Sequence, residues 1–280
     1  MTTPWFQSLL DLGLRPYVAT ARHQLAGLDL SVLGVSHEIY YLEDASAKSF
    51  HQAYVTANAL AFGARDLKMP GWVYIDCVLM QTAVVGFLAQ KSKVPKSLLD
   101  EFKAEADIDL DALEWIPVSG QVASPAMDGN TLVGFSLFSL RSYWPELPAL
   151  GLATKALALQ VYGAGQRDKF LGITQYDNPA LSMHGRFGPR LEIISPRVPL
   201  HAQGNNTLVY GMKIDFDPHT LHEKPAVVAE PDFWLETGDG AGIDQMVAGI
   251  ASGSRYFILP PFQVRDGQKL KLPIAEEKAK

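Results

Sequence analysis

A segment of small residues stands where a predicted helix would begin, and its backbone could bind a phosphate. Gly151, Leu152, Ala153 and Thr154 open a run of good helix formers that extends to Tyr162. The first amides of a helix have no intrahelical acceptor and carry a partial positive charge, which together suit a diphosphate. Gly151 and Ala153 would let a ligand approach the backbone, and Thr154 could add a hydroxyl. The sequence therefore predicts a phosphate-binding site over residues 151–154.

Lys155 follows this segment directly and offers a different chemistry. A lysine surrounded by apolar residues can lose its proton and form a Schiff base with a carbonyl substrate. The simpler interpretation places Lys155 on the exposed side of an amphipathic helix, with Leu152, Ala156 and Leu159 facing inward. We favour the simpler interpretation and keep the Schiff-base lysine as an alternative.

Other residues with reactive side chains give weak patterns. His219, His222 and Glu223 lie close together, but the helical His-Glu-x-x-His pattern is missing, so we expect a solvated loop and no metal. Cys77 is the only cysteine and is expected to be a small buried apolar residue. The sequence contains neither a Gly-x-Ser-x-Gly elbow nor a Gly-x-x-x-x-Gly-Lys-Ser/Thr loop, which argues against those hydrolases and nucleotide enzymes.

The elements that must position residues 151–154 alternate between strands and helices. A helix is predicted over 152–162 and a short helix over 178–187, with Pro179 in its first turn. β-Branched and aromatic residues predict strands around both helices, over 131–140, 170–176, 190–195 and 207–216. The sequence thus predicts an α/β protein in which the loop 141–150 and the helix after it connect two strands.

The flanking regions complete the predicted organisation. The first 25 residues could form an amphipathic helix, a helix is predicted over 45–64, and 72–77 and 83–89 are predicted as strands. From Asp217 onward, prolines and glycines indicate an irregular extension. We therefore expect a helical arm over 1–30, a domain over 31–216, and an irregular C-terminal extension over 217–280 that packs on the domain.

Residues 148–153 read Pro-Ala-Leu-Gly-Leu-Ala, and residues 177–188 read Asp-Asn-Pro-Ala-Leu-Ser-Met-His-Gly-Arg-Phe-Gly. With these two segments and the order of the elements around them, residues 130–215 resemble the GNAT superfamily of acyl-CoA-dependent N-acetyltransferases. Residues 148–153 are similar to the family loop Gln/Arg-x-x-Gly-x-Gly/Ala, with Pro148 replacing the basic or amide residue. Residues 177–188 are similar to a second family pattern, Asn-x-x-Ala-x-x-x-Tyr-x-x-x-Gly. Asp177 or Asn178 stands at the Asn position and His184 at the Tyr position.

The resemblance implies a fold, a co-substrate and a reaction. The fold is a mixed, mostly antiparallel sheet flanked by helices, and acyl-CoA is the co-substrate. The cofactor-binding residues are Gly151, Leu152, Ala153, Thr154 and Asn178, with the pantetheine arm in an opening between two neighbouring strands. His184 takes the place of the tyrosine that protonates the departing thiolate. The expected activity moves an acyl group to a small amine or similar acceptor.

Two alternatives stay open. The order of strands, small-residue loop and lysine is also similar to the acetoacetate decarboxylase-like superfamily, which usually has two adjacent lysines where this chain has Thr154 and Lys155. The other alternative is a non-enzymatic binder of a small apolar ligand, with a pocket formed by aromatic residues. That pocket would be lined by Trp72, Phe87, Phe135, Phe138 and Trp144.

Composition limits the classes of partner. The 280 residues include 24 Lys plus Arg and 30 Asp plus Glu, a formal net charge of −6, so binding to nucleic acid is not expected. The apolar runs fall short of the roughly 20 residues that span a bilayer, and the N-terminal sequence does not resemble a secretory signal. We expect a cytoplasmic protein with a small-molecule substrate and no membrane span. The N-terminal arm would pack on the body or on a second subunit of a homodimer.

Overall fold

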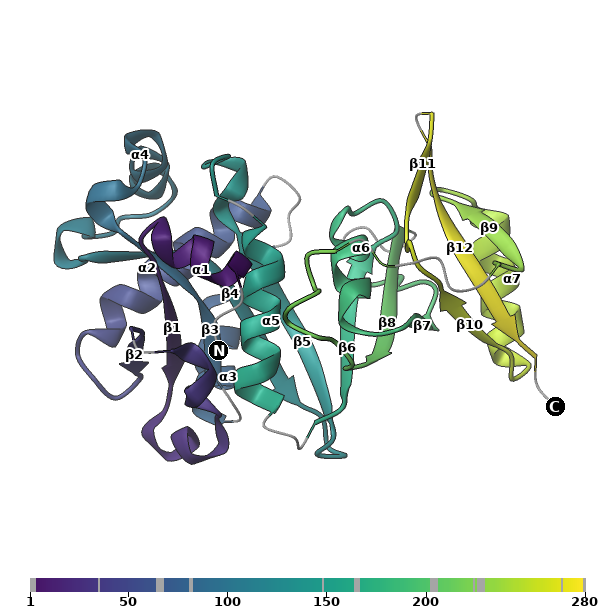
Figure 1. Cartoon of the computed structure of the whole chain (residues 1–280), viewed down its shortest axis with the longest axis horizontal. Helices are drawn as coiled ribbons and strands as arrows, with labels where there is room; N and C mark the ends of the chain where they lie inside the picture. The colour runs from purple at the N-terminus through teal and green to yellow at the C-terminus, as the bar shows by residue number, and fades with distance from the viewer. Residues whose placement is uncertain are drawn as a thin grey trace. The chain divides into compact units, whose positions relative to one another are not determined.

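The computed structural model describes residues 4–34, 36–63, 68–80, 83–147, 149–163, 167–201, 206–223, 225, 230–267 and 269–278. The chain divides into two compact units (Figure 1). Unit 1 comprises residues 1–129 and 134–167, and unit 2 comprises residues 130–133 and 168–280. No helix of the described ranges is both long enough and apolar enough to cross a bilayer.

Unit 1 is a sheet with helices on both faces. The strand order is β5-β4-β3-β1-β2, where β1 and β2 are parallel and β3 is antiparallel to both of its neighbours. Ser119 and Gly120 are adjacent on β4 and therefore face opposite sides. Ser119 meets Thr154 of α5, whereas Gly120 faces Tyr54 of α2. The bounds are α1 (Pro4–Asp11), β1 (Leu14–Thr20), β2 (Glu38–Tyr41), α2 (Ala47–Phe62), α3 (Gly71–Met80), β3 (Ala83–Gln90), α4 (Lys96–Glu105), β4 (Trp115–Pro125), β5 (Thr131–Ser139) and α5 (Leu150–Gly163).

Aromatic packing holds α2 and α3 against this sheet. The ring of Tyr54 lies 4.9 Å from that of Tyr74 on α3 and 5.3 Å from that of Phe138 on β5. The hydroxyl of Tyr17 on β1 donates to the carbonyl of Ser119 at 3.0 Å. These large side chains are fully buried, so they form the core of unit 1 together with the apolar side chains of α5.

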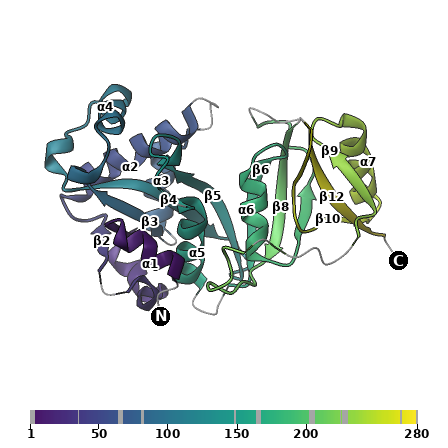
Figure 2. The same cartoon turned by 45° about the horizontal axis from the view of Figure 1, so that its top comes forward.

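Unit 2 is built on antiparallel strands, with one parallel pair. The order is β11-β12-β10-β7-β8-β6-β5, and β9 also pairs with β12. At the parallel pair, Thr131–Val133 of β5 align with Lys169–Leu171 of β6. Figure 2 shows α7 beside β9, β10 and β12. The bounds are β6 (Lys169–Gln175), α6 (Ala180–His184), β7 (Leu191–Ser195), β8 (Thr207–Lys213), β9 (Phe233–Glu236), α7 (Gly240–Ala251), β10 (Arg255–Ile258), β11 (Val264–Asp266) and β12 (Lys269–Glu277).

The structure confirms the predicted α/β fold with a mixed, mostly antiparallel sheet. It corrects the prediction for residues 72–77, which lie in α3 and not in a strand. The amphipathic helix expected over the first 25 residues is also wrong, because α1 ends at Asp11 and Leu14–Thr20 form β1 between β2 and β3. Beyond Asp217, where we expected irregular chain, the structure has β9, α7, β10, β11 and β12.

Candidate functional site

The start of α5 is where the sequence predicts phosphate binding. Gly151 has open space beside it, since a Cβ added there would meet no atom within 4 Å. Leu152, Ala153 and Thr154 are buried, and the Thr154 hydroxyl lies 2.8 Å from the Leu150 carbonyl and 2.7 Å from Ser119 Oγ. Gly151 is therefore the residue of this set that leaves room for a ligand, whereas Thr154 uses its hydroxyl inside the core. Pro148 of the family-like loop lies outside the described residues.

Lys155 is fully buried, which overturns our expectation that it occupies an exposed helix face. All residues of α5 from Leu152 to Leu159 are buried, because this helix packs on β3 and β4 and also contacts the 3-10 helix Leu30–Leu33. Burial lowers the pKa of the Lys155 amine well below its ordinary value, because removal from water disfavours the charged form. The amine thus has the electronic character that a Schiff-base lysine needs.

The junction of β6 and α6 in unit 2 carries the second family-like pattern. Asn178 Oδ1 accepts a hydrogen bond from the Ala180 amide at 3.0 Å, so its side chain organises the turn that leads into α6. His184, the last residue of α6, is 9% exposed and packs on Tyr210 of β8, with the ring centroids 5.3 Å apart. His184 is not among the residues that line either of the two pockets described for this structure.

Phe262 and Gln263, which directly precede β11, contact the junction of β6 and α6. Gln263 Nε2 donates to the carbonyls of Tyr176 at 2.8 Å and of Asn178 at 3.0 Å, and Gln263 Oε1 accepts from Ser182 Oγ at 3.3 Å. Phe262 has a φ of 68°, unusual for a residue with a bulky side chain, and its ring packs directly on Gly185. The C-terminal segment therefore holds α6 in place.

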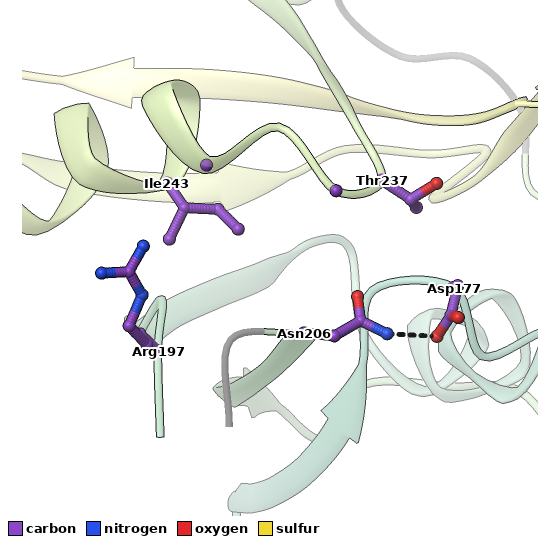
Figure 3. A pocket seen from close by; sticks show the side chains of 7 residues that line it. Asp177, Arg197, Asn206, Thr237 and Ile243 are labelled. Atoms are coloured by element: carbon purple, nitrogen blue, oxygen red, sulfur yellow. Dashed lines mark hydrogen bonds between the residues drawn. The ribbon is translucent and has the colours of Figure 1, made fainter. Parts of the chain in front are cut away.

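A pocket opens beside the same junction, within unit 2. Its volume is about 620 Å³, in the range of small-molecule sites. Figure 3 shows Asp177, Asn206 and Thr237 on one side of it, and Arg197 and Ile243 on the other. Gly238 and Gly240 complete the lining. These residues come from three separate segments of the chain, which the pairing of β6 with β8 and the position of α7 bring together.

Two opposite charges define the chemistry of this pocket. The Asn206 side-chain amide donates to Asp177 Oδ1 at 2.7 Å, and Arg197 Nη2 lies 2.9 Å from Asp244 Oδ1. Arg197 Nε is buried and has no hydrogen-bond partner among the described residues. The neighbouring Tyr176 is fully buried, and that burial raises the pKa of its phenol although the charge of Arg197 opposes the shift. The pocket thus offers both a cation and an anion to a ligand.

The predicted site residues fall into both units. Gly151, Leu152, Ala153 and Thr154 belong to unit 1, and Asn178 and His184 belong to unit 2. Within unit 2, Asn178 lies two residues before α6, and His184 is the last residue of that helix. Of the residues lining the pocket, only Asp177 belonged to a predicted site. Arg197, Thr237 and Ile243 had no local pattern that could have identified them.

The aromatic residues expected to line an apolar pocket have different environments. Phe87 and Phe138 are buried, and Phe87 packs against Phe6 with ring centroids 5.6 Å apart. Trp72 is 64% exposed and Phe135 is 54% exposed. Phe87 and Phe138 are therefore core residues of unit 1, whereas Trp72 and Phe135 lie on its surface.

Within the described part of the chain, no cluster of three or more His, Cys, Asp or Glu could hold a metal ion. Cys77 is buried in α3, and burial raises the pKa of its thiol to about 11, which disfavours the reactive thiolate.

In comparisons with known proteins, no family model matches this chain and no curated protein matches its sequence.

Proposed function

We propose that this protein is an acyl-CoA-dependent acyltransferase that moves an acyl group to a small amine. The observation that carries the proposal is the arrangement of β5, α5 and β6. The two strands are parallel neighbours, aligned at Thr131–Val133 and Lys169–Leu171, and α5 is the helix of the connection between them. The GNAT superfamily binds its coenzyme with the amides at the start of such a helix and with an opening between two such strands.

The register of β5 and β6 adds support to the proposal. β5 and β6 are aligned at Thr131–Val133 and Lys169–Leu171, near the start of both strands. β5 continues to Ser139, beyond the residues that are aligned with β6. An extended pantetheine arm could pair with backbone groups of a strand edge in the way that another strand does.

Each assigned residue has one role in the proposed reaction. The open backbone at Gly151 receives the diphosphate. The acceptor nitrogen attacks the thioester carbonyl, a C–N bond forms, and the C–S bond breaks. A backbone amide stabilises the oxyanion, His184 donates a proton to the departing thiolate, and the acceptor nitrogen loses a proton to water. Asn178 keeps its structural role at the start of α6.

Titration calorimetry with acetyl-CoA and longer acyl-CoA thioesters tests the binding step. We expect saturable heat from the wild-type protein and none from Gly151→Trp, because the indole would fill the open space at the start of α5. Gly163→Trp is the matched control, since Gly163 ends the same helix and also has no atom within 4 Å of an added Cβ. The absence of heat with the wild-type protein, or equal loss in both variants, would contradict the proposal.

His184→Gln tests the chemical step. We expect kcat to fall by about 10²-fold or more, the usual contribution of a general acid, while the Kd of acyl-CoA stays unchanged. The alkaline limb of the pH–rate profile should disappear in the variant, since that limb reports deprotonation of the acid. A variant that keeps the wild-type kcat would remove His184 from the mechanism.

The buried amine of Lys155 supports a second candidate function, that of a Schiff-base enzyme. In that reaction the amine nitrogen attacks the keto carbon of a β-keto acid, and the carbonyl oxygen leaves as water. Borohydride should then reduce the imine to a stable secondary amine, which mass spectrometry of a digest would locate at Lys155. An unmodified Lys155 after this treatment counts against the second candidate.

A further inference from the structure

We propose that the pocket lined by Asp177 and Arg197 binds the acceptor, and that the acceptor carries a carboxylate as well as an amine. This inference rests on the proposed acyltransferase function and names its second substrate class. The ligands in question are amino acids and related aminocarboxylates. The argument depends on two charged side chains, the space between them, and the position of the pocket beside α6.

Arg197 provides the group that would bind the carboxylate. Its guanidinium has one charged partner among the described residues, Asp244, and that carboxylate is two-thirds exposed. An exposed ion pair contributes little free energy, so a ligand carboxylate can compete for the same donors. The buried Nε has no acceptor among the described residues, so Asp244 does not use the whole donor capacity of the guanidinium. A ligand carboxylate would bind the terminal Nη donors of Arg197.

Asp177 provides the group that would bind the amine. The Asn206 amide holds one of its carboxylate oxygens, and Asn206 is itself held through its carbonyl, which accepts from the Tyr176 amide at 3.0 Å. The Asp177 side chain is exposed and lines the pocket on the side opposite Arg197 (Figure 3). Asp177 also directly precedes Asn178 and the helix that ends at His184. An ammonium bound there would stand at the start of the segment to which the mechanism assigns its acid.

The space between the two charges suits a carbon chain. The pocket of about 620 Å³ exceeds what a single inorganic ion needs. Ile243 gives it an apolar wall, and Gly238 and Gly240 leave room, because a Cβ at either glycine would meet nothing within 4 Å. A simple amine would leave Arg197 without its ligand, and a simple acid would leave Asp177 without one. A ligand with both charges satisfies both residues.

Calorimetry without acyl-CoA tests the inference directly, with aminocarboxylates of increasing length from glycine to aminohexanoate. We expect the affinity to peak at one chain length, because two side chains fixed on opposite walls select one separation of charges. An alkylamine and an alkylcarboxylate of that length should bind at least about tenfold more weakly. Equal affinity for all three compounds, or no binding of any of them, would overturn the inference.

Variants place the binding in this pocket. Arg197→Met and Asp177→Asn should each weaken binding of the preferred aminocarboxylate by about tenfold or more. Arg265→Met and Asp266→Asn are matched controls, because both residues are exposed on β11 of the same unit and outside the pocket lining. Far-ultraviolet circular dichroism verifies that each variant is folded. Equal loss of affinity in pocket and control variants would overturn the inference.

Two outcomes separate this inference from the proposed function. If aminocarboxylates bind in an Arg197-dependent manner but no acyl transfer is found, the pocket assignment stands and the transferase does not. If acyl groups move to simple amines and the acceptor KM is the same in Arg197→Met as in the wild type, the transferase stands and the acceptor assignment fails.

Discussion

At the scale of single residues, Lys155 is an ionisable side chain that the fold removes completely from water. The residue is fully buried in α5, which packs on β3 and β4 and contacts the 3-10 helix Leu30–Leu33. Burial of an ammonium group is costly, and the protein limits that cost by lowering the pKa of the amine so that the neutral form is favoured. We therefore expect Lys155 to reduce the stability of unit 1 at neutral pH.

Replacement of Lys155 by methionine should raise the free energy of unfolding by about 1–3 kcal/mol at neutral pH, because folding then no longer requires an amine to lose the proton that it carries in the unfolded chain. The folded pKa lies below the unfolded value of 10.5, so the unfolded chain binds the extra proton. Wild-type stability due to this group therefore rises with pH until about 10.5. The stability advantage of Lys155→Met over the wild type should therefore decrease as the pH rises toward 10.5. Urea unfolding of both proteins at several pH values measures this advantage.

The control for this prediction is Lys96→Met, which removes a lysine charge that is 90% exposed on α4. Its effect on stability should be small and nearly independent of pH. A gain in Lys155→Met that stays constant from about pH 7 to pH 10 would show that the amine titrates at its ordinary pKa in the folded protein.

Local sequence identified part of the candidate site. Small size at Gly151 and the polar turn at Asn178 are properties of single residues, so a sequence pattern can report them. The charge pair of Asp177 and Arg197 depends on the pairing of β6 with β8, which no local pattern contains. Burial of Lys155 likewise results from the packing of α5 on other elements. The residues next to Lys155 in the sequence do not indicate this burial.

At the scale of elements, β3 and β4 approach each other through paired glycines. Gly86 aligns with Gly120, and a Cβ at Gly86 would collide with the backbone carbonyl of Ser119. A Cβ at Gly120 would lie 2.6 Å from the ring of Tyr54 and 2.9 Å from the Tyr17 hydroxyl. The two glycines thus let the strands and the buried tyrosines pack at their present distance.

Gly86→Ala should lower the free energy of unfolding by about 3 kcal/mol, because a backbone carbonyl cannot yield as a flexible side chain can. Gly151→Ala is the matched control, since its Cβ meets nothing and alanine is favoured in a helix by about 0.5–1 kcal/mol. Urea unfolding followed by circular dichroism measures both. A Gly86→Ala variant as stable as the wild type would mean that the strands can separate at no cost.

Sequence patterns correctly predicted the secondary structure of those elements whose residue types favour the conformation they adopt. The strands near 131–140, 170–176 and 207–216 and the helix ending near Tyr162 follow from composition. Residues 72–77 were misassigned because Trp, Val, Tyr and Ile also fill a helix, α3, that packs on the sheet. Helical spacing near the N-terminus likewise concealed β1, whose residues are almost all buried. Burial from two sides removes the alternation that normally marks a strand.

At the scale of the whole molecule, charge governs which partners can approach. The formal net charge of −6 gives a field that repels phosphate backbones. We expect the fluorescence anisotropy of a labelled DNA duplex or RNA strand to stay at its free value when the protein is added at low salt. Tight, salt-sensitive binding of either would contradict this expectation and point to a local basic surface.

The outermost strands also have a consequence for behaviour in concentrated solution. β2 and β9 are four residues long and β11 is three. Each carries a carboxylate in an ion pair: Glu38 with Arg15, Glu236 with Lys269, and Asp266 with Lys271. Exposed edges of long, uncharged strands can recruit a neighbouring chain into an aggregate. Because these edges are short and charged, they discourage intermolecular strand pairing and the growth of fibres.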